Sequence, residues 1–451
     1  MSDRAVAASI GQVPSGRLEH KHPPQLNLDV LLHIMGYLKN RLDILELMKT
    51  CRILYTHGFS FVLQTRVRIW DNEGLVSFRD FMISDPSHQK TGIRSHYRYL
   101  RSLEFVTDDD INVGDESSSA FIEILESAIN LEDLKLDGDT IFKNSPEAFQ
   151  ALLGLPQLRS FDIQDGHQKT VDWVGATISP ISKLNLVLWD CDEVDIFPQL
   201  ANVSGTLREL TVTASQPPTI DVRFPHLQKL SFYTYESFPA SVLVSVFPCL
   251  KRLEFAMHNK SHPEFSDMDD NEMRQQHEHN QAELVSRGLS LYPLEYLKAQ
   301  PNDLYLSAFL PQADTYHVAM DYLDEQNENM LYRVLPFVQP SRLVIPVVTY
   351  DDETVTFPML RRIFAATSAL SSLKLLELFI NISHFHKQAA EQLMFTFQVP
   401  GVNKITLKIA AASKVWTFHW DLEELRERLE QHAKSRENDG SIVTAESGNS
   451  T

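Results

Sequence analysis

The segment from Leu26 to Tyr55, LNLDVLLHIMGYLKNRLDILELMKTCRILY, decides how the N-terminal part of the chain folds. Its apolar residues recur at helical spacing, which predicts short amphipathic helices. Asn27 is placed to cap the first helix, and Asp29 suits the partial positive charge of its first turn. Two further apolar stripes follow after Asn40. We therefore expect three short helices between residues 23 and 66.

Three helices of this length carry more apolar surface than they can bury against one another. Some of that surface must meet a neighbour. One interpretation is an ordinary helical subdomain that packs on the rest of this chain. The other is a docking module whose neighbour is a second protein.

The same segment resembles the F-box family, whose motif runs Leu-Pro-x-Glu-Leu-Leu-x-x-Ile-Phe-x-Tyr-Leu and continues to Val-Cys-Arg-x-Leu/Trp. The matching residues are Leu26, Asp29, Val30, Leu31, Ile34, Met35, Tyr37, Leu38, Asp43, Ile44, Leu45, Leu47, Thr50, Cys51, Arg52 and Leu54. The sequence departs from the motif at Asn27, where proline is usual, and at Met35, where phenylalanine is common. Both departures are mild, because Asn caps a helix well and Met fills a similar volume.

The resemblance implies a function as well as a fold. F-box proteins bind a Skp-type adaptor and, through it, the cullin scaffold of a ubiquitin ligase. Carried over to this chain, the resemblance assigns adaptor binding to Leu26, Val30, Leu31, Ile34, Met35, Leu45, Cys51 and Leu54. It covers about a tenth of the sequence.

Length and charge restrict the class of protein further. The chain has 451 residues, enough for two or three domains, and a formal net charge of −19. Such acidity argues against nucleic-acid binding, which needs a basic surface, and against anionic membranes. We find neither a signal peptide nor an apolar stretch long enough to cross a membrane. The three cysteines are widely separated and form no zinc-binding pattern. We therefore expect a cytoplasmic or nuclear protein.

A repeated L-x-x-L-x-apolar unit dominates the chain after the helical segment. The units are Leu100/Leu103/Phe105, Leu131/Leu134/Leu136, Leu158/Phe161/Ile163, Ile181/Leu184/Leu186, Leu207/Leu210/Val212, Leu227/Leu230/Phe232, Leu250/Leu253/Phe255, Leu294/Leu297/Ala299 and Leu373/Leu376/Leu378. Up to Leu250 they start roughly 20 to 31 residues apart, which is typical of leucine-rich repeats.

The segments between the units favour helices. Residues 121–129, 146–153, 240–247 and 359–366 each have the pattern of a short helix. Alternating strands and helices predict an α/β fold in which residues 67–420 form an irregular leucine-rich-repeat solenoid, with strands on the concave side and helices on the convex side. The alternative is a non-repetitive α/β domain that is rich in leucine.

Strand alternation predicts which side chains of the solenoid can touch a target protein. If the leucines of each unit point inward, the residues between them project from the concave sheet. Aromatic side chains on such a surface are typical interface anchors. The predicted target-binding residues are Asn185, Trp189, Tyr233, Tyr235 and Phe379. Alternatively, a loop or the C-terminal tail covers them.

Several segments interrupt or flank the repeats. Residues 258–283 are acidic and rich in histidine, but their spacing fits no standard metal site, so we expect a solvated, partly disordered insertion. Residues 108–119 are expected to form an acidic loop. Residues 421–436 have the pattern of a helix that caps the repeats, with Asp421 as its N-cap. Disordered tails are expected at 1–22 and 437–451.

No catalytic motif stands out in the sequence. Phosphate-binding glycine loops, a nucleophile elbow and kinase signatures are all missing, and we expect no metal or cofactor. The sequence therefore predicts a non-catalytic subunit of an SCF-type ubiquitin ligase, in which the F-box binds the Skp-type adaptor and the solenoid binds a target protein. Two alternatives stay open: a ligase-independent leucine-rich-repeat scaffold, and an enzyme whose catalytic residues come from distant parts of the chain. The sequence does not identify the target.

Overall fold

The computed structural model describes residues 27–83, 96–106, 115–137, 145–188, 196–214, 218, 221–234, 238–257, 269–319, 325–348, 362, 365–366, 370–381, 404–411 and 414–421. The chain divides into two compact units, Met1–Thr65 and Arg66–Thr451, which we call the helical unit and the sheet unit.

The helical unit contains α1 (Leu28–Tyr37), α2 (Arg41–Met48) and α3 (Arg52–Gln64). As predicted, the Asn27 side chain caps α1 by accepting a hydrogen bond of 3.0 Å from the backbone N–H of Asp29. Asn40 caps α2 in the same way, through the N–H of Leu42 at 3.1 Å. Both caps satisfy amides that the helix itself leaves without a partner.

The core of the helical unit is built around α3, which contacts both α1 and α2. Its buried residues are Met35, Ile44, Met48, Leu54 and Val62. Gly58 lies where α3 passes closest to α2. A Cβ built on Gly58 would lie 2.2 Å from Met48 Cγ, so the two helices need a glycine here.

The sheet unit is a mixed α/β structure with one 14-stranded sheet, in which the spatial order of the strands is their order along the chain. Strands β1 to β13 run parallel, and β14 pairs antiparallel with β13. The strands are β1 (Val67–Ile69), β2 (Ser102–Phe105), β3 (Asp133–Asp137), β4 (Ser160–Gly166), β5 (Lys183–Leu188), β6 (Glu209–Ala214), β7 (Lys229–Thr234), β8 (Arg252–Met257), β9 (Leu294–Ala299), β10 (Ala313–Val318), β11 (Arg342–Val348), β12 (Leu375–Asn381), β13 (Lys404–Ala411) and β14 (Lys414–Asp421).

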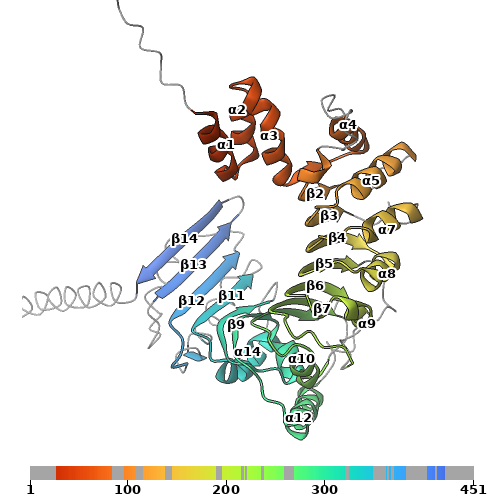
Figure 1. Ribbon diagram of the computed structural model, residues 1–451. Helices are drawn as coiled ribbons and strands as arrows, with labels where there is room; N and C mark the ends of the chain where they lie inside the picture. The colour runs from red at the N-terminus through yellow and green to blue at the C-terminus, as the bar shows by residue number, and fades with distance from the viewer. Residues whose placement is uncertain are drawn as a thin grey trace, which may run out of the picture. The chain divides into compact units, whose positions relative to one another are not determined.

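Helices connect most of the parallel strands, as parallel pairing requires. They are α4 (Asn72–Ile83), η1 (Tyr97–Tyr99), α5 (Asp115–Ser127), α7 (Pro146–Leu153), α8 (Gln168–Ala176), α9 (Ile196–Gln199), η2 (Leu200–Asn202), α10 (Ala240–Val246), α12 (Asp270–Ser286), α13 (Pro301–Ser307) and α14 (Glu325–Val338). Figure 1 shows α5, α7 and α8 together on one face of strands β3 to β6. We call the opposite face of the sheet the open face.

Each predicted L-x-x-L-x-apolar unit coincides with a strand. The second positions of the first three units, Leu103, Leu134 and Phe161, are register partners on β2, β3 and β4. The third positions of the same units, Phe105, Leu136 and Ile163, are register partners as well. All six side chains are buried. Aromatic side chains from the helices complete the core: Phe105 packs on Phe121 of α5 with ring centroids 5.9 Å apart.

Two segments differ from the sequence-based expectation. Residues 270–283, expected to be part of a solvated insertion, belong to α12, in which Met273, Asn280 and Leu284 are buried. The acidic pattern concealed this helix, because its apolar residues are few. Similarly, residues 115–119 are the first turns of α5 and not part of a loop. Asp421, expected to cap a C-terminal helix, is the last residue of β14.

Other expectations fall on residues that the structure does not describe. They are the tails 1–22 and 437–451, the capping helix after Asp421, residues 258–268 of the insertion and most of the helix at 359–366. Among the described helices, none is both long and apolar enough to span a bilayer. The described residues contain no cluster of histidine, cysteine or carboxylate side chains that could hold a metal ion.

Candidate functional site

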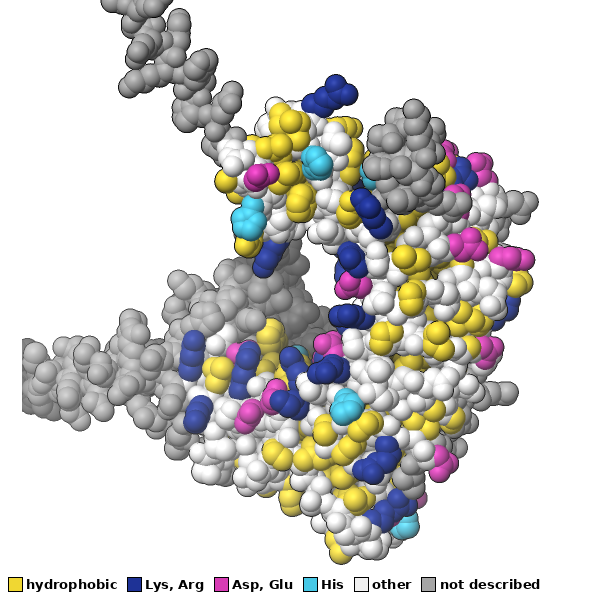
Figure 2. Space-filling model, viewed as in Figure 1, with side chains coloured by type: hydrophobic (Ala, Val, Ile, Leu, Met, Phe, Trp, Pro, Cys, Tyr) yellow, Lys and Arg dark blue, Asp and Glu magenta, His cyan; other side chains and the backbone are white. Residues whose placement is uncertain are grey.

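Two surfaces of the molecule stand out, one on each unit. The first is a set of exposed apolar side chains on the helical unit, namely Val30, Ile34, Tyr37, Leu42, Ile53 and Tyr55. These are half of the twelve large apolar side chains that are exposed among all described residues. Figure 2 shows hydrophobic side chains gathered on the helical unit. We call these six residues the apolar surface of the helical unit.

The apolar surface follows from the amphipathic pattern of the helices. Val30, Ile34 and Tyr37 recur every three or four residues, so they form a stripe along α1. Tyr37 is 72% exposed and Leu42 67% exposed, while Met35 on the other side of α1 is fully buried. The helix therefore has two apolar faces, of which the unit's own core covers only one.

The structure separates the predicted adaptor-binding residues into three groups. Val30, Ile34 and Cys51 are exposed, and Leu31 and Leu45 are partly buried against the core of the unit. Met35 and Leu54 are completely buried in that core. Both of these side chains hold the three helices together, and neither is exposed for direct contact with a partner.

Leu26 lies outside the described residues. Sequence reasoning did not assign partner binding to Tyr37, Leu42, Ile53 and Tyr55. A signal exists for Tyr37 and Leu42, because each falls on the side of its helix away from the buried residues, whereas Ile53 and Tyr55 flank the buried Leu54 on α3.

The second surface is the open face of the sheet, where side chains alternate with the buried ladder. Two rows of register partners run across it from strand to strand. Row A is Ser102, Asp133, Ser160, Lys183, Glu209, Lys229, Arg252, Tyr296, Thr315, Arg342, Leu375 and Lys404. Row B is Arg68, Glu104, Lys135, Asp162, Asn185, Thr211, Ser231, Glu254, Lys298, His317, Val344, Glu377 and Thr406.

A buried carboxylate organises the N-terminal end of these rows. Glu104 on β2 is only 4% exposed. Arg68 Nε lies 2.5 Å from Glu104 Oε2, and Lys135 Nζ lies 3.4 Å from Oε1. Arg66 reaches the same carboxylate at 3.8 Å and also bonds Asp133 at 3.1 Å. A buried charge needs such partners. At this end of the open face, Glu104 and Asp133 are therefore held in ion pairs with Arg66, Arg68 and Lys135.

The middle of the open face is polar and hydrogen-bonded within itself. Asp162 on β4 accepts hydrogen bonds of 2.8 Å from the side-chain amides of Asn185 and Gln164. One strand further on, Lys183 and Glu209 are 3.9 Å apart in row A, and both are largely exposed.

The C-terminal part of the open face combines aromatic and basic side chains. The Arg252 guanidinium lies over the ring of Tyr296, 5.1 Å from its centroid, and Tyr296 Oη is 3.3 Å from His317 Nδ1. Burial raises the pKa of Tyr296, and the charge of Glu254 adds to this effect.

The pKa of His317 is shifted in the opposite direction from that of Tyr296. Burial lowers the pKa of His317, and the positive charge of the neighbouring Lys298 lowers it further. The imidazole is therefore held in its neutral form at pH 7.

The predicted target-binding residues fall on this open face where they are described. Asn185 lies in row B, and Tyr233 and Phe379 lie two residues beyond row B on β7 and β12. All three are partly buried. Trp189 and Tyr235 lie outside the described residues. Sequence reasoning did not assign a role to Tyr296 and His317, because the positions of β9 and β10 within the rows depend on the register of the sheet.

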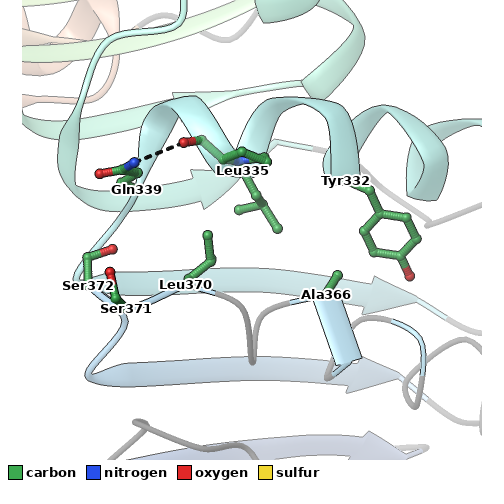
Figure 3. A pocket seen from close by; sticks show the side chains of 8 residues that line it. Tyr332, Leu335, Gln339, Ala366, Leu370, Ser371 and Ser372 are labelled. Carbon is green, nitrogen blue, oxygen red and sulfur yellow. Dashed lines mark hydrogen bonds between the residues drawn. The ribbon is translucent and has the colours of Figure 1, made fainter.

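A small pocket of about 210 Å³ lies beside the C-terminal part of α14. Figure 3 shows Leu335 and Leu370 between Tyr332 on one side and Ser371 and Ser372 on the other. None of its lining residues carries a charged side chain. Leu335, Pro336, Ala366 and Leu370 make half of the lining apolar, and the side chains of Tyr332, Gln339, Ser371 and Ser372 make the other half polar.

No protein-family model matches the sequence, and a search of curated proteins found no match either.

Proposed function

We propose that this chain is the substrate-recognition subunit of an SCF-type ubiquitin ligase. In this proposal the helical unit is an F-box that binds a Skp-type adaptor, and the adaptor joins it to the cullin scaffold. The sheet unit is an irregular leucine-rich-repeat solenoid, and its open face binds the target protein. The chain performs no catalysis itself.

The observation that carries the proposal is the apolar surface of the helical unit. Val30, Ile34 and Tyr37 form an exposed apolar stripe along α1, and contiguous exposed apolar side chains on a soluble protein often mark a binding site. Two of the exposed side chains, Tyr37 and Tyr55, belong to a residue type that is enriched at the centre of interfaces. The resemblance of residues 26–54 to the F-box motif names the partner that such a surface would fit.

The free energy available from burying the apolar surface is of the same order as the cost of association. Full burial of one large apolar side chain contributes about 1.5–3 kcal/mol, so side chains that are half buried already can contribute about half of that. Six such residues therefore supply about 5–9 kcal/mol. Association costs about 4–15 kcal/mol, so polar contacts around the apolar surface must add to the affinity.

The mechanism in this proposal is positional. A target held on the open face is kept close to the ubiquitin that the ligase carries, which raises the effective concentration of its lysines. The other subunits supply the chemistry. The alternative, a ligase-independent scaffold, differs in one respect: its helical unit binds no Skp-type adaptor.

Co-purification of the full chain with a purified Skp-type adaptor tests the proposal. The unmodified chain should retain the adaptor, and a double variant with Val30→Asp and Ile34→Asp should lose it. Ile178→Asp is the matched control, because Ile178 is 88% exposed but belongs to the sheet unit. This control should bind as well as the unmodified chain.

Circular dichroism should show that both variants are folded, since exposed positions tolerate substitution. If the adaptor is retained by the double variant, or is not bound by the unmodified chain, the F-box assignment is wrong.

A further inference from the structure

The open face becomes more basic along the sheet. On β1 to β6, rows A and B carry four carboxylates (Glu104, Asp133, Asp162 and Glu209) against three cations (Arg68, Lys135 and Lys183), and Arg66 adds a fourth cation to the same network. On β7 to β13, the same rows carry five cations (Lys229, Arg252, Lys298, Arg342 and Lys404) against two carboxylates (Glu254 and Glu377). This basic region belongs to a chain whose formal net charge is −19.

The two carboxylates of the basic region neutralise only part of it. Arg342 Nη2 lies 2.9 Å from Glu377 Oε1, and Lys298 Nζ lies 3.8 Å from Glu254 Oε2. Among the residues whose side chains are described, no carboxylate lies within ion-pair distance of Lys229 or Arg252, and Lys404 is the register partner of Asp421 on β14. Figure 2 shows basic and acidic side chains interspersed over the C-terminal strands.

The surroundings of these cations favour carboxylate binding over simple solvation. Tyr296 and His317 are partly buried between the charged strands and offer an apolar surface. The Arg252 guanidinium is stacked on the Tyr296 ring, which orients it without neutralising it. Charges beside a partly desolvated surface interact more strongly with a ligand than charges surrounded by water.

We propose that strands β7 to β13 of the open face bind an acidic segment of a protein partner, with Lys229, Arg252, Arg342 and Lys404 contacting its carboxylates. The proposal takes from the proposed function only the idea that the open face holds a target. The interspersed Glu254 and Glu377 make the region a poor match for the continuous phosphates of a nucleic acid.

The dimensions of the sheet set the length of the segment. Neighbouring strands are about 4.8 Å apart, so the six intervals from β7 to β13 span about 29 Å. An extended peptide covers about 3.3 Å per residue, and its alternate side chains share one face. About nine or ten residues with a carboxylate at every second position therefore cover the basic region.

Fluorescence anisotropy with the full chain tests this proposal. The probe is a ten-residue fluorescein-labelled peptide of alternating glutamate and serine, and its control has glutamine in place of glutamate. The glutamate peptide should bind at least about tenfold more tightly, and added salt should weaken its binding because exposed charges are screened.

Two variants locate the binding. A double variant with Arg252→Gln and Lys404→Gln should reduce the affinity about three- to tenfold, the loss expected for two exposed charge contacts. Lys183→Gln removes a cation of row A on β5, outside the basic region of β7 to β13, and should leave the affinity unchanged. Tryptophan fluorescence and thermal unfolding should show that each variant is folded.

Four outcomes would overturn the proposal. They are equal binding of the glutamate and glutamine peptides, an equal loss with Lys183→Gln, tighter binding of a single-stranded oligonucleotide than of the peptide, and peptide binding that occurs only after residues 422–451 are removed. The assay contains no adaptor. Failure of the peptide to bind is therefore distinct from failure of the Skp-type adaptor to bind the helical unit.

Discussion

The helical unit and the sheet unit differ in how completely they bury their large apolar side chains. In the sheet unit, the leucine ladder from β2 to β12 is almost completely buried between the sheet and its helices. The helical unit is much smaller, yet it leaves Val30, Ile34, Tyr37, Leu42, Ile53 and Tyr55 exposed. The sheet unit therefore buries its apolar ladder within itself, whereas the helical unit leaves much of its apolar surface exposed.

The difference is one of topology as much as composition. Each strand of the sheet unit buries its leucines against the strands before and after it, so a long array hides nearly all of them. Three short helices form a small unit, which cannot by itself cover both faces of each helix. Exposed apolar side chains are thus expected in the helical unit.

The largest expected effect contrasts two leucines, one in each unit. Leu230→Ala removes a fully buried side chain from β7 and should lower the free energy of unfolding of the sheet unit by about 2–5 kcal/mol, since it leaves a cavity. Leu42→Ala, at an exposed position of α2, should cost less than about 0.5 kcal/mol. Urea unfolding followed by tryptophan fluorescence measures the first effect, and amide exchange in α1 to α3 measures the second. Equal losses would mean that Leu42 is not surface-exposed.

A second substitution acts inside the helical unit alone. Gly58→Val forces a side chain into the space occupied by Met48 and should destabilise the three helices by about 1–3 kcal/mol. Gly36→Ala is the control, because its added Cβ makes only an ordinary contact of 3.4 Å with Phe61. Amide exchange should accelerate in α1 to α3 with the first variant and stay unchanged in the strands. Faster exchange in both units would contradict the division of the chain into two units.

Among the described residues of the sheet unit, Glu328 is the most completely buried carboxylate, ahead of Glu104 and Asp303. Glu328 on α14 is 2% exposed and accepts hydrogen bonds from Arg362 at 2.6 and 2.7 Å, and from Tyr332. Arg362→Met should destabilise the sheet unit by about 1–2 kcal/mol, because it leaves a buried charge with fewer partners. Arg274→Met, which breaks an exposed ion pair with Glu278, should have almost no effect. Thermal unfolding compares the two.

The contribution of the Glu328–Arg362 pair to the stability of the fold depends on pH, and the direction of that dependence follows from the pKa of Glu328. Burial alone would raise the pKa of Glu328, but hydrogen bonds from Arg362 and Tyr332 outweigh burial and lower it below its usual value of 4.5. A carboxylate with a lowered pKa stabilises the fold above pH 4.5, and this contribution is lost as the pH falls through the lowered pKa. The loss should be absent from a variant that carries Glu328→Gln.

The smallest expected effect concerns His317 on the open face. Its surroundings are Tyr296, Lys298, Glu254, Arg342 and Glu377, and burial followed by Lys298 lowers its pKa below 6.5. The unfolded chain therefore takes up the proton first, and stability should fall slightly as the pH drops below 6.5 towards the folded-state pKa. His317→Gln should remove this dependence. A histidine signal that titrates above pH 6.5 in nuclear magnetic resonance would contradict the stated cause.

Much of the sheet was predictable from the leucine pattern. Every predicted unit coincides with a strand. Its second and third apolar positions lie in the strand and point to the same, buried face. Five strands, β1, β10, β11, β13 and β14, were not among the predicted units. The buried residues of β10 are Ala313, Tyr316 and Val318, which include no leucine. The helix α12 was missed because its packing depends on Met273, Asn280 and Leu284 within an acidic sequence.

The surfaces were less predictable than the fold. The sequence shows that Ile34 and Met35 are both apolar, but only the packing of α1 on α3 decides that Met35 is buried and Ile34 is exposed. On the open face, the row that joins Arg252 to Arg342 depends on the register of four strands. Loop lengths between strands vary, so residue spacing alone does not give that register.

The most direct test of the central claim is amide hydrogen exchange of the full chain with and without a purified Skp-type adaptor. If the apolar surface is the docking site, exchange should slow in α1 and α3 at saturating adaptor, and β2 to β12 should be unchanged. Protection confined to the sheet unit, or no protection anywhere in the chain, would contradict the claim.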